Sequence, residues 1–597
     1  MKKILIPVLL FVAAFFTACN QELLDIPQKG VISTESFYKT DADAEAAMVA
    51  AYQGFLWNVC SKEGGSIYAP FRATFCLPGD DMYAAGSDYG DNDFMRELNE
   101  FSNDPANEVS RNCYNNIYYA MYYCNLVIDY FKDGLPEGGP TATTKRVVAE
   151  ARVLRAWMHM MLAIGWGTPP LVDHVLAGSD LPLNCDNPEN ENPMTHEQLL
   201  EWCAKECEAA VADLDERTSP TDKNGAVKVT KGFANAVAGK AYLFAGKYAE
   251  AKTALKKVID SKKYELVSGD KYWQNFHVEG DCNEEKVFEA NLETSASIPT
   301  YWDIVNRSTW MESQIWGWRS DHFTKNADGQ VGIDPTQVYT DGVEGWGGCG
   351  IPKSFADEFV ANDGEDSYRL KATMRNIEDV IYDTVYGDAT VDALTRDQKK
   401  ESKAIGIKDL GLYGQSFYLP LKQLIRPADK ASGNVRKNNF VIMRYAEVLL
   451  LYAEACVQTG DAASALPVIN DIQKRAGSKT ISTSVDLNVV KKEKKFELWL
   501  EMCRWPDMVR WGDLDLAKQA GSAVPVLYDK LTRAPQAGDV DVTWQHGSEA
   551  NSRFYTVSTH RAKDDGKPVG YTDTHKVFPY PDKVVNTNTK LIQNPGY

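Results

Sequence analysis

Tryptophans are concentrated in one part of this 597-residue sequence. Five of the 14 tryptophans lie between residues 302 and 346, where even spacing would place about one. Pyranose rings present apolar C–H faces that stack on flat indole and phenol surfaces, so clustered aromatic rings are suited to holding a sugar. The cluster predicts a glycan-binding site, whose candidate residues are Trp302, Trp310, Trp316, Trp318 and Trp346.

Two neighbours of these tryptophans complete the predicted site. Tyr301 adds a phenol ring, and the Arg319 guanidinium can donate hydrogen bonds that orient sugar hydroxyls beside the stacking rings. A loop-rich segment that uses large aromatics as its own core would have the same composition. The sequence leaves both interpretations open, contact with a ligand and an internal core.

A second candidate loop runs from Cys76 to Asn92 and is polar, glycine-containing and aromatic at once. Its candidate ligand-binding residues are Asp81, Tyr83 and Tyr89. Such a loop can close the other side of a sugar site, because binding residues often lie on loops held by a rigid scaffold. A simple exposed connector is the competing interpretation.

No motif for catalysis or for metal binding is found in the sequence. His-Glu-x-x-His, Gly-x-Ser-x-Gly and a Walker loop are absent, and the eight histidines are dispersed. A glycosidase needs only two carboxylates across a sugar, and adjacent acids such as Asp80 and Asp81 keep that alternative open. We predict a protein that is not an enzyme and has no cofactor; the sequence does not decide whether a structural calcium ion binds.

The elements that must position these residues are predicted to be mostly α-helices, because long stretches carry helical periodicity. A loop-rich aromatic subdomain, residues 275–415, separates an N-terminal helical part, 19–274, from a C-terminal helical part, 416–597, within one domain. The predicted helices are Asp41–Trp57, Arg111–Phe131, Lys145–Ile164, His196–Leu214, Lys231–Phe244, Ala249–Ser261, Tyr445–Thr459, Ala462–Arg475 and Val489–Trp511.

Two helix pairs share the spacing of a tetratricopeptide hairpin, in which small residues let antiparallel helices approach closely. The first spans 231–261, with Gly239, Gly246 and Ala251 at the small positions. The second spans 445–475 and places Ala453, Gly460 and Ala465 on the corresponding positions. Two copies in one register favour a repeat scaffold, an α-superhelix, over unrelated hairpins.

The first residues read as an export signal with a lipid-attachment site. Lys2 and Lys3 precede an apolar run from Ile4 to Phe16, and Thr17-Ala18 leads to Cys19. We predict that residues 1–18 are removed and that Cys19 carries the lipid. No later segment has eighteen consecutive apolar residues, so the body is expected to be anchored to a membrane by its lipid and not to span it.

Charge and cysteine content narrow the partners further. The net charge of −19 disfavours nucleic acid and does not penalise a neutral sugar. Removing Cys19 from 12 cysteines leaves 11 without the spacing of a disulfide framework. Cys203 and Cys207 lie one helical turn apart with no further metal-ligand motif, so buried packing is favoured over metal binding.

Several segments together resemble the SusD-like (RagB-type) outer-membrane nutrient-binding lipoproteins. The residues that resemble the family are Leu24-Asp25-x-Pro27, Ser33-Thr34 with Phe37-Tyr38-Lys39-Thr40, Ala149–Trp157 with Gly165–Val172, Arg444–Leu450, Ala453–Ala455, Arg475–Gly477, Glu497-Leu498, Arg504–Asp513, Phe578–Pro581 and Gln593–Tyr597. The stretches Trp499–Cys503 and Met158–Met161 depart from the family pattern in ways that look like packing changes.

The resemblance implies a tetratricopeptide-containing α scaffold that is tethered to the extracellular face of the outer membrane. It also implies a nutrient-binding protein without catalysis whose partner is a SusC-like TonB-dependent transporter. Together with the aromatic cluster, this predicts that the protein captures a glycan and delivers it to that transporter. The resemblance does not name the glycan, since the matched motifs belong to the scaffold. A peptide receptor of the same architecture therefore stays open as the alternative, with the glycosidase behind it.

Overall fold

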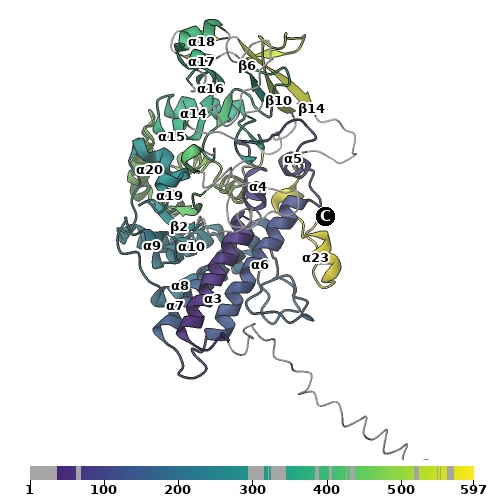
Figure 1. Cartoon of the computed structure of the whole chain (residues 1–597). Coiled ribbons are helices and arrows are strands. Elements are labelled where there is room, and N and C mark those ends of the chain that lie inside the picture. The colour runs from purple at the N-terminus through teal and green to yellow at the C-terminus, as the bar shows by residue number, and fades with distance from the viewer. Residues whose placement is uncertain are drawn as a thin grey trace, which may run out of the picture.

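The computed structural model describes residues 37–61, 69–292, 315–319, 322–324, 345–383, 389–402, 406–424, 426–429, 437–515, 523–542, 544–546, 549–551, 553–560 and 570–597. The predicted signal peptide, residues 1–18, and the predicted lipid site, Cys19, lie outside this part of the chain. The fold is mostly α, as predicted. Figure 1 shows long helices at one end of the body and short helices with a small sheet at the other.

Three long helices form the N-terminal end of the body. They are α3 (Asp41–Phe55), α6 (Glu108–Phe131) and α7 (Ala142–Trp166), and each packs against the other two. Threonine N-caps fix where two of them begin, because the Thr40 and Thr141 side chains each accept a hydrogen bond from the third helical residue in a capping box. Shorter neighbours are α4 (Pro70–Cys76), α5 (Asp93–Glu100), α8 (His196–Ala210) and α9 (Lys223–Ala226).

The two predicted hairpins are confirmed, with ends that differ from the prediction by one residue. The first consists of α10 (Lys231–Phe244) and α11 (Tyr248–Asp260), and the second of α19 (Tyr445–Gln458) and α20 (Ala462–Ala476). A Cβ added at Gly239 would lie 2.4 Å from Leu255 Cγ, so the first crossing needs a glycine. Because α11 packs on α19, the hairpins stack as consecutive repeats.

The predicted helix Val489–Trp511 is wrong, because the structure divides it into α21 (Leu487–Glu497) and α22 (Arg504–Trp511). Leu500 and Met502 between them have φ angles of 60° and 62°, a left-handed conformation that interrupts a right-handed helix. Pro506 then stands in the first turn of α22, where it needs no amide hydrogen bond. The break places Trp499 in the core and lets the Leu500 carbonyl accept a hydrogen bond from Arg72.

The predicted loop-rich segment contains short elements in its described residues. Its helices are α14 (Lys353–Asp363), α15 (Tyr368–Thr373), α16 (Ile377–Asp383), α17 (Ala389–Asp392) and α18 (Arg396–Ser402). Its strands pair with each other and with strands elsewhere in the chain, so the segment is joined to both helical parts. A last helix, α23 (Asp582–Thr587), lies near the C-terminus.

The strands form one four-stranded antiparallel sheet, in the order β11-β14-β10-β7, and several pairs. The sheet strands are β7 (Leu412–Tyr413), β10 (Ala523–Asp529), β11 (Val540–Asp541) and β14 (Phe554–His560). The pairs join β1 (Tyr83–Ala84) with β4 (Cys349–Gly350), β2 (Lys286–Ala290) with β9 (Phe440–Arg444), β3 (Phe323–Thr324) with β6 (Gly406–Ile407), β5 (Met374–Asn376) with β8 (Tyr418–Pro420), and β12 (Trp544–His546) with β13 (Glu549–Asn551).

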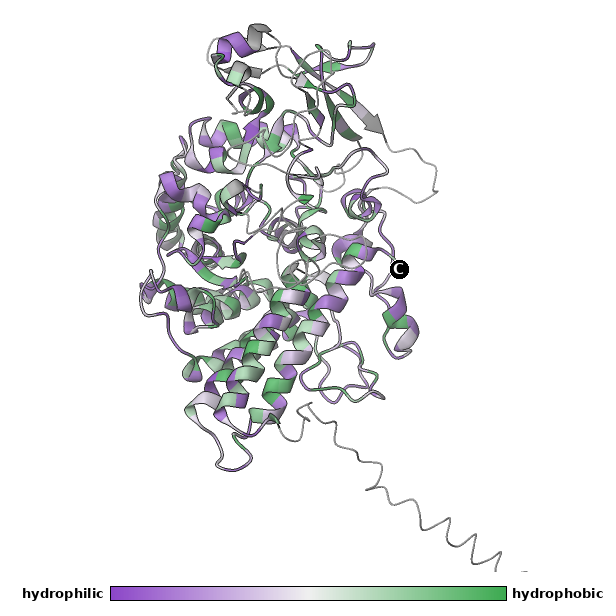
Figure 2. Ribbon diagram, in the orientation of Figure 1, coloured by the Kyte–Doolittle hydropathy of each residue, from purple (hydrophilic) through white to green (hydrophobic). Residues whose placement is uncertain are grey.

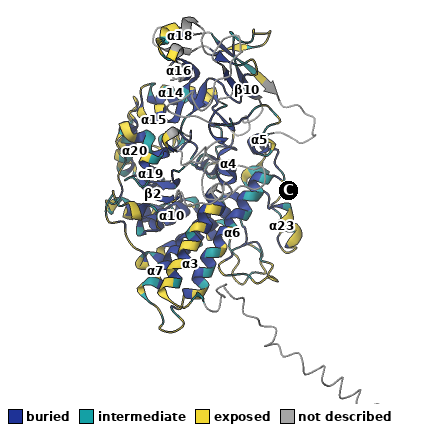
Figure 3. Ribbon diagram, viewed as in Figure 1, coloured by how far each residue is buried: buried dark blue, intermediate teal, exposed yellow. Residues whose placement is uncertain are grey.

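One large hydrophobic core runs through the helices and the strand pairs. Figure 2 shows apolar and polar residues alternating along the helices, and Figure 3 shows the outward side of α3 exposed while α4, α10 and β2 are buried. Cys203 and Cys207 are completely buried in this core, as predicted. Within the described part of the chain, no helix combines the length and the apolar character that crossing a membrane requires.

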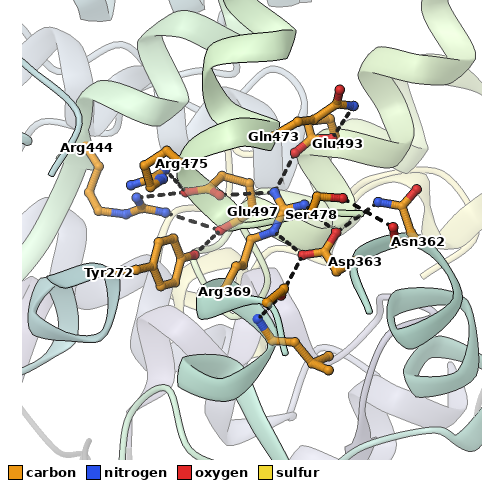
Figure 4. A network of polar contacts seen from close by, with 12 residues as sticks. Tyr272, Asn362, Asp363, Arg369, Arg444, Gln473, Arg475, Ser478, Glu493 and Glu497 are labelled. Carbon is orange, nitrogen blue, oxygen red and sulfur yellow. Dashed lines mark hydrogen bonds and ion pairs between the residues drawn. The ribbon is translucent and has the colours of Figure 1, made fainter. Parts of the chain in front are cut away.

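A buried charge network lies between α15, β9, α20 and α21 (Figure 4). Arg369, Arg444 and Arg475 all contact Glu497, whose side chain is fully buried. The other carboxylates that neutralise these arginines are Glu285, Asp363, Glu493 and Glu501. Opposite charges in direct contact compensate one another inside the core. The network therefore holds the elements that contain these residues together.

Candidate ligand-binding site

The structure brings the two predicted aromatic segments together. In the antiparallel pair of β1 and β4, Tyr83 stands opposite Gly350 and Ala84 opposite Cys349. The pairing continues one residue further, because the Ala85 amide donates to the Gly348 carbonyl at 3.2 Å. The loop 76–92 and the end of the tryptophan-rich segment therefore form one continuous structure.

A tight backbone approach holds the tryptophan-rich segment against itself. The Gly347 amide donates to the Gly317 carbonyl and the Gly348 amide to the Ile315 carbonyl, both at 2.7 Å. A Cβ at Gly345 would lie 2.2 Å from the Gly317 carbonyl carbon, so only glycine permits this approach. A Cβ at Gly347 would meet Arg319 Cγ at 2.6 Å, which places the stem of Arg319 directly on this turn.

A tyrosine cluster lies where β1 meets the four-stranded sheet, and we call it the aromatic junction: Tyr83, Tyr89, Tyr413 and Tyr528, packed with Val524 and Val526. Tyr83, Tyr89 and Tyr528 are half-buried, so each presents part of its ring to the surface. The Arg96 guanidinium lies 4.2 Å from the centre of the Tyr89 ring and donates a 2.6 Å hydrogen bond to its hydroxyl. This contact fixes the Tyr89 ring in place.

The predicted tryptophans occupy different environments. Trp316 and Trp318 are 0% and 2% exposed and belong to the main core, as the alternative of an internal aromatic core expects. Trp346 and Arg319 are half-buried and therefore keep an accessible part. Trp302, Trp310 and Tyr301 lie outside the described residues. Ligand contact by any of these residues stays a prediction.

Asp81 supports the loop from inside, because its side chain is 2% exposed and its carbonyl accepts a 2.9 Å hydrogen bond from the Trp499 indole. Burial, followed by the charge of Asp80, raises the pKa of Asp81 to about 7. Burial also acts to raise the pKa of Asp80, but hydrogen bonds and charge from Arg504, with Lys495, lower it. The Asp80 to Arg504 contacts are 2.6 and 2.9 Å long.

Sequence reasoning missed Tyr413, Tyr528 and Arg96 as members of this site. Val524, Val526 and Tyr528 alternate along β10, a period-two pattern that indicates a strand with one buried face. That pattern could have predicted the strand, but not its position beside Tyr83. Tyr413 enters because β7 pairs with β10, with Tyr413 opposite Val526.

Comparison with known proteins gives consistent matches. The sequence model of the SusD family matches residues 314–597. A SusD-like protein, P38, of Formosa agariphila is 21% identical over 523 residues, which cover 85% of this chain and 91% of the relative. A SusD-like protein of Bacteroides ovatus is 24% identical over 511 residues, which cover 84% of this chain and 81% of the relative.

Solved structures match over almost the whole chain. A laminarin-binding SusD-like protein is similar with a TM-score of 0.66 and 20% identity, covering 94% of this chain and 100% of its own. Surface glycan-binding protein A from Bacteroides thetaiotaomicron, in complex with laminarihexaose, gives a TM-score of 0.66 with 19% identity, covering 93% of this chain and 100% of its own. At these identities the likeness establishes the fold.

Proposed function

Because the chain belongs to the SusD-like family, we propose that it binds a glycan at the cell surface and passes it to a SusC-like TonB-dependent transporter. Similar solved structures include a laminarin-binding protein and a surface glycan-binding protein in complex with laminarihexaose, which supports a glycan ligand and a binding role for this chain. The bound glycan of this chain is accordingly expected to leave the protein unchanged.

The observation that carries this proposal is the pairing of β1 with β4. It joins two segments that were each predicted to bind sugar, and it sets the half-buried rings of the aromatic junction beside a segment that carries Trp346 and Arg319. Aromatic rings stack on sugar C–H faces, and the guanidinium donates hydrogen bonds to hydroxyls. The ligand-binding residues in this proposal are Tyr83, Tyr89, Trp346 and Arg319, with Trp302, Trp310 and Tyr301 as further candidates.

The net charge of −19 supports a neutral ligand. An acidic surface repels polyanions and imposes no electrostatic cost on an uncharged polysaccharide. Weak binding at a surface site is compensated when the protein is tethered next to its transporter, because tethering raises the effective concentration of the bound glycan.

The place of the protein in the cell forms part of the same proposal. Acylated Cys19 would hold the body on the extracellular face of the outer membrane. Residues 19–597 would act there as one domain above the transporter. The proposed function involves no nucleic acid partner and no cofactor. A peptide ligand in place of the glycan would leave the fold and the tether unchanged, so the experiment must separate the two.

Affinity gel electrophoresis against a panel of neutral polysaccharides, laminarin included, tests the proposal. The wild-type protein should be retarded by at least one polysaccharide, and the double variant Tyr83→Ala, Trp346→Ala should migrate freely in that gel. Tyr122→Ala, which removes an exposed tyrosine on α6, is the matched control and should be retarded like the wild type. Binding of peptides without binding of any polysaccharide, or release of reducing sugar by the pure protein, would refute the proposal.

A further inference from the structure

A pocket separate from the aromatic junction opens between the 3-10 helix η4 (Gly269–Phe276), α15 and β5. Its volume is about 820 Å³, which lies in the range of pockets that hold small ligands. None of its lining residues belongs to the junction. The lining includes Asp270, Trp273, Tyr368, Arg375, Asp379 and Arg426.

Tyr368 forms an open aromatic platform at the wall of this pocket. Its ring is 49% exposed and rests on two glycines, since a Cβ at Gly269 or Gly477 would come within 2.4 and 2.9 Å of Tyr368 Cδ2. The absence of side chains at the two glycines lets one edge of the ring lie close to the backbone. A large exposed aromatic side chain beside a cavity is suited to stacking on a ligand.

Trp273 forms a second aromatic wall, with one side covered by an arginine. The Arg426 guanidinium lies 4.4 Å from the centre of the Trp273 ring. Arg426 is itself held by ion pairs with Glu279 and Asp429. The indole is half-buried, so part of it faces the pocket while the guanidinium fixes its orientation.

The buried charge network contains the chain neighbours of both aromatic walls, Arg369 and Tyr272 (Figure 4). Arg369, the residue after Tyr368, is completely buried and binds Asp363 at 2.8 and 2.9 Å and Glu497 at 3.1 Å. Tyr272, the residue before Trp273, is also completely buried, and the Arg475 guanidinium lies 4.7 Å from its ring centre. Both platforms are therefore attached to one rigid support, which reduces the entropy lost on binding.

The charges that line the pocket balance. The lining contains four cations and four carboxylates: Arg375, Arg396, Arg426 and Lys371, and Asp270, Glu365, Asp366 and Asp379. Two of the pairs are closed, Lys371 with Asp366 at 2.9 Å and Arg396 with Asp379 at 2.7 Å. A lining of this kind gives donors and acceptors for hydroxyl groups without favouring a charged ligand.

We propose that this pocket is a second carbohydrate site, which binds a short neutral oligosaccharide or the end of a glycan chain on Tyr368 and Trp273. The site extends the proposed function and rests on it for the ligand class, but it uses none of the residues of the aromatic junction. Two separated sites would let one chain hold a polysaccharide at two points.

The test is 19F NMR of the intact lipidated protein in detergent, with 5-fluorotryptophan in place of tryptophan and the Trp273 signal assigned by Trp273→Phe. The probes are laminarihexaose, maltohexaose, cellohexaose, xylohexaose and mannohexaose at millimolar concentration. At least one of them should shift the Trp273 signal. Tyr368→Ala should weaken that interaction about tenfold, and Tyr122→Ala should leave it unchanged.

Three results would overturn the inference. The first is a Trp273 signal that is unchanged by every neutral hexasaccharide, and the second is a Trp273 signal that responds to oligogalacturonides or peptides instead. The third is that Tyr368→Ala binds with the same affinity as the wild type. Circular dichroism shows whether Tyr368→Ala is folded. If this variant is not folded, the shift of the Trp273 signal in the wild-type protein decides the case. The Trp273 shift should persist in the double variant Tyr83→Ala, Trp346→Ala. Retention in the polysaccharide gel therefore tests the aromatic junction, and the Trp273 shift tests the second site separately.

Discussion

Arg369 Nη1 lies 3.1 Å from Glu497 Oε2, and both side chains are completely excluded from solvent. Glu497 also binds Arg475 at 2.6 Å and Arg444 at 3.1 Å, so a single carboxylate serves three buried guanidinium groups. These groups come from three separate elements, α15, β9 and α20. Glu497 therefore connects the loop-rich segment, through Arg369, with the second hairpin, through Arg475.

Removing this charge should destabilise the whole protein. Glu497→Gln keeps the shape and leaves buried guanidinium groups short of a counter-charge, which costs about 3 to 5 kcal/mol of unfolding free energy. Glu108→Gln, which breaks the partly exposed 2.9 Å pair with Arg111, is the control and should cost less than about 1 kcal/mol. Urea denaturation measures both values, and equal losses would show that the network does not stabilise the fold.

The first hairpin should reject even one methyl group at its crossing. Gly239→Ala places a Cβ 2.4 Å from Leu255 Cγ, and overpacking of this kind costs about 1 to 3 kcal/mol despite the better helix propensity of alanine. The double variant Gly239→Ala, Leu255→Ala should lose less stability than the sum of the losses of the two single variants. Thermal melts of the four proteins measure the coupling; strict additivity would contradict a contact at this crossing.

Stability should depend on the protonation of Asp81. The folded state holds the Asp81 proton more tightly than the unfolded state, because its pKa is raised to about 7 by burial and by Asp80. The folded protein therefore binds more protons between the ordinary carboxyl pKa and about 7, and unfolding free energy falls as pH rises through that window. Above it the buried carboxylate is charged and the cost is complete.

Asp81→Asn removes this cost. The stability advantage of the variant over the wild type should therefore grow from pH 5 to pH 8 and reach at least about 1.4 kcal/mol at pH 8. Melting temperatures across this range provide the measurement. Asp88→Asn, an exposed aspartate in the same loop, should run parallel to the wild type at every pH. A difference between Asp81→Asn and the wild type that does not change with pH would contradict the assigned titration.

Two tryptophans of the same segment should give opposite results on substitution. Trp316→Ala deletes a fully buried indole and should cost about 3 to 5 kcal/mol of unfolding free energy. Trp346→Ala changes a half-buried ring and should cost clearly less, while it weakens retention by the polysaccharide that binds the wild type. Denaturation and affinity electrophoresis on both variants provide the comparison. Full retention by folded Trp346→Ala would remove this residue from the proposed site.

The sequence by itself determined the helical scaffold, because helical periodicity relates residues three or four positions apart and the hairpin spacing lies within one short segment. The first hairpin is an example, since the spacing of Gly239, Gly246 and Ala251 predicts two antiparallel helices that approach closely, and α10 and α11 form them. The same local rules failed at Leu500 and Met502, whose left-handed conformation depends on contacts with distant residues such as Arg72. A helical pattern cannot report such contacts.

Only the tertiary structure decided which aromatic rings are core and which can meet a ligand. Trp316, Trp318 and Trp346 are alike in sequence, yet Trp316 and Trp318 are buried in the main core and Trp346 is only half-buried. The pairing of Tyr83 with Gly350, and the support that Arg369 and Tyr272 give to their neighbours, also join residues from distant parts of the chain. Exposure is a property of what packs over a side chain, and in this protein those partners come from far along the sequence.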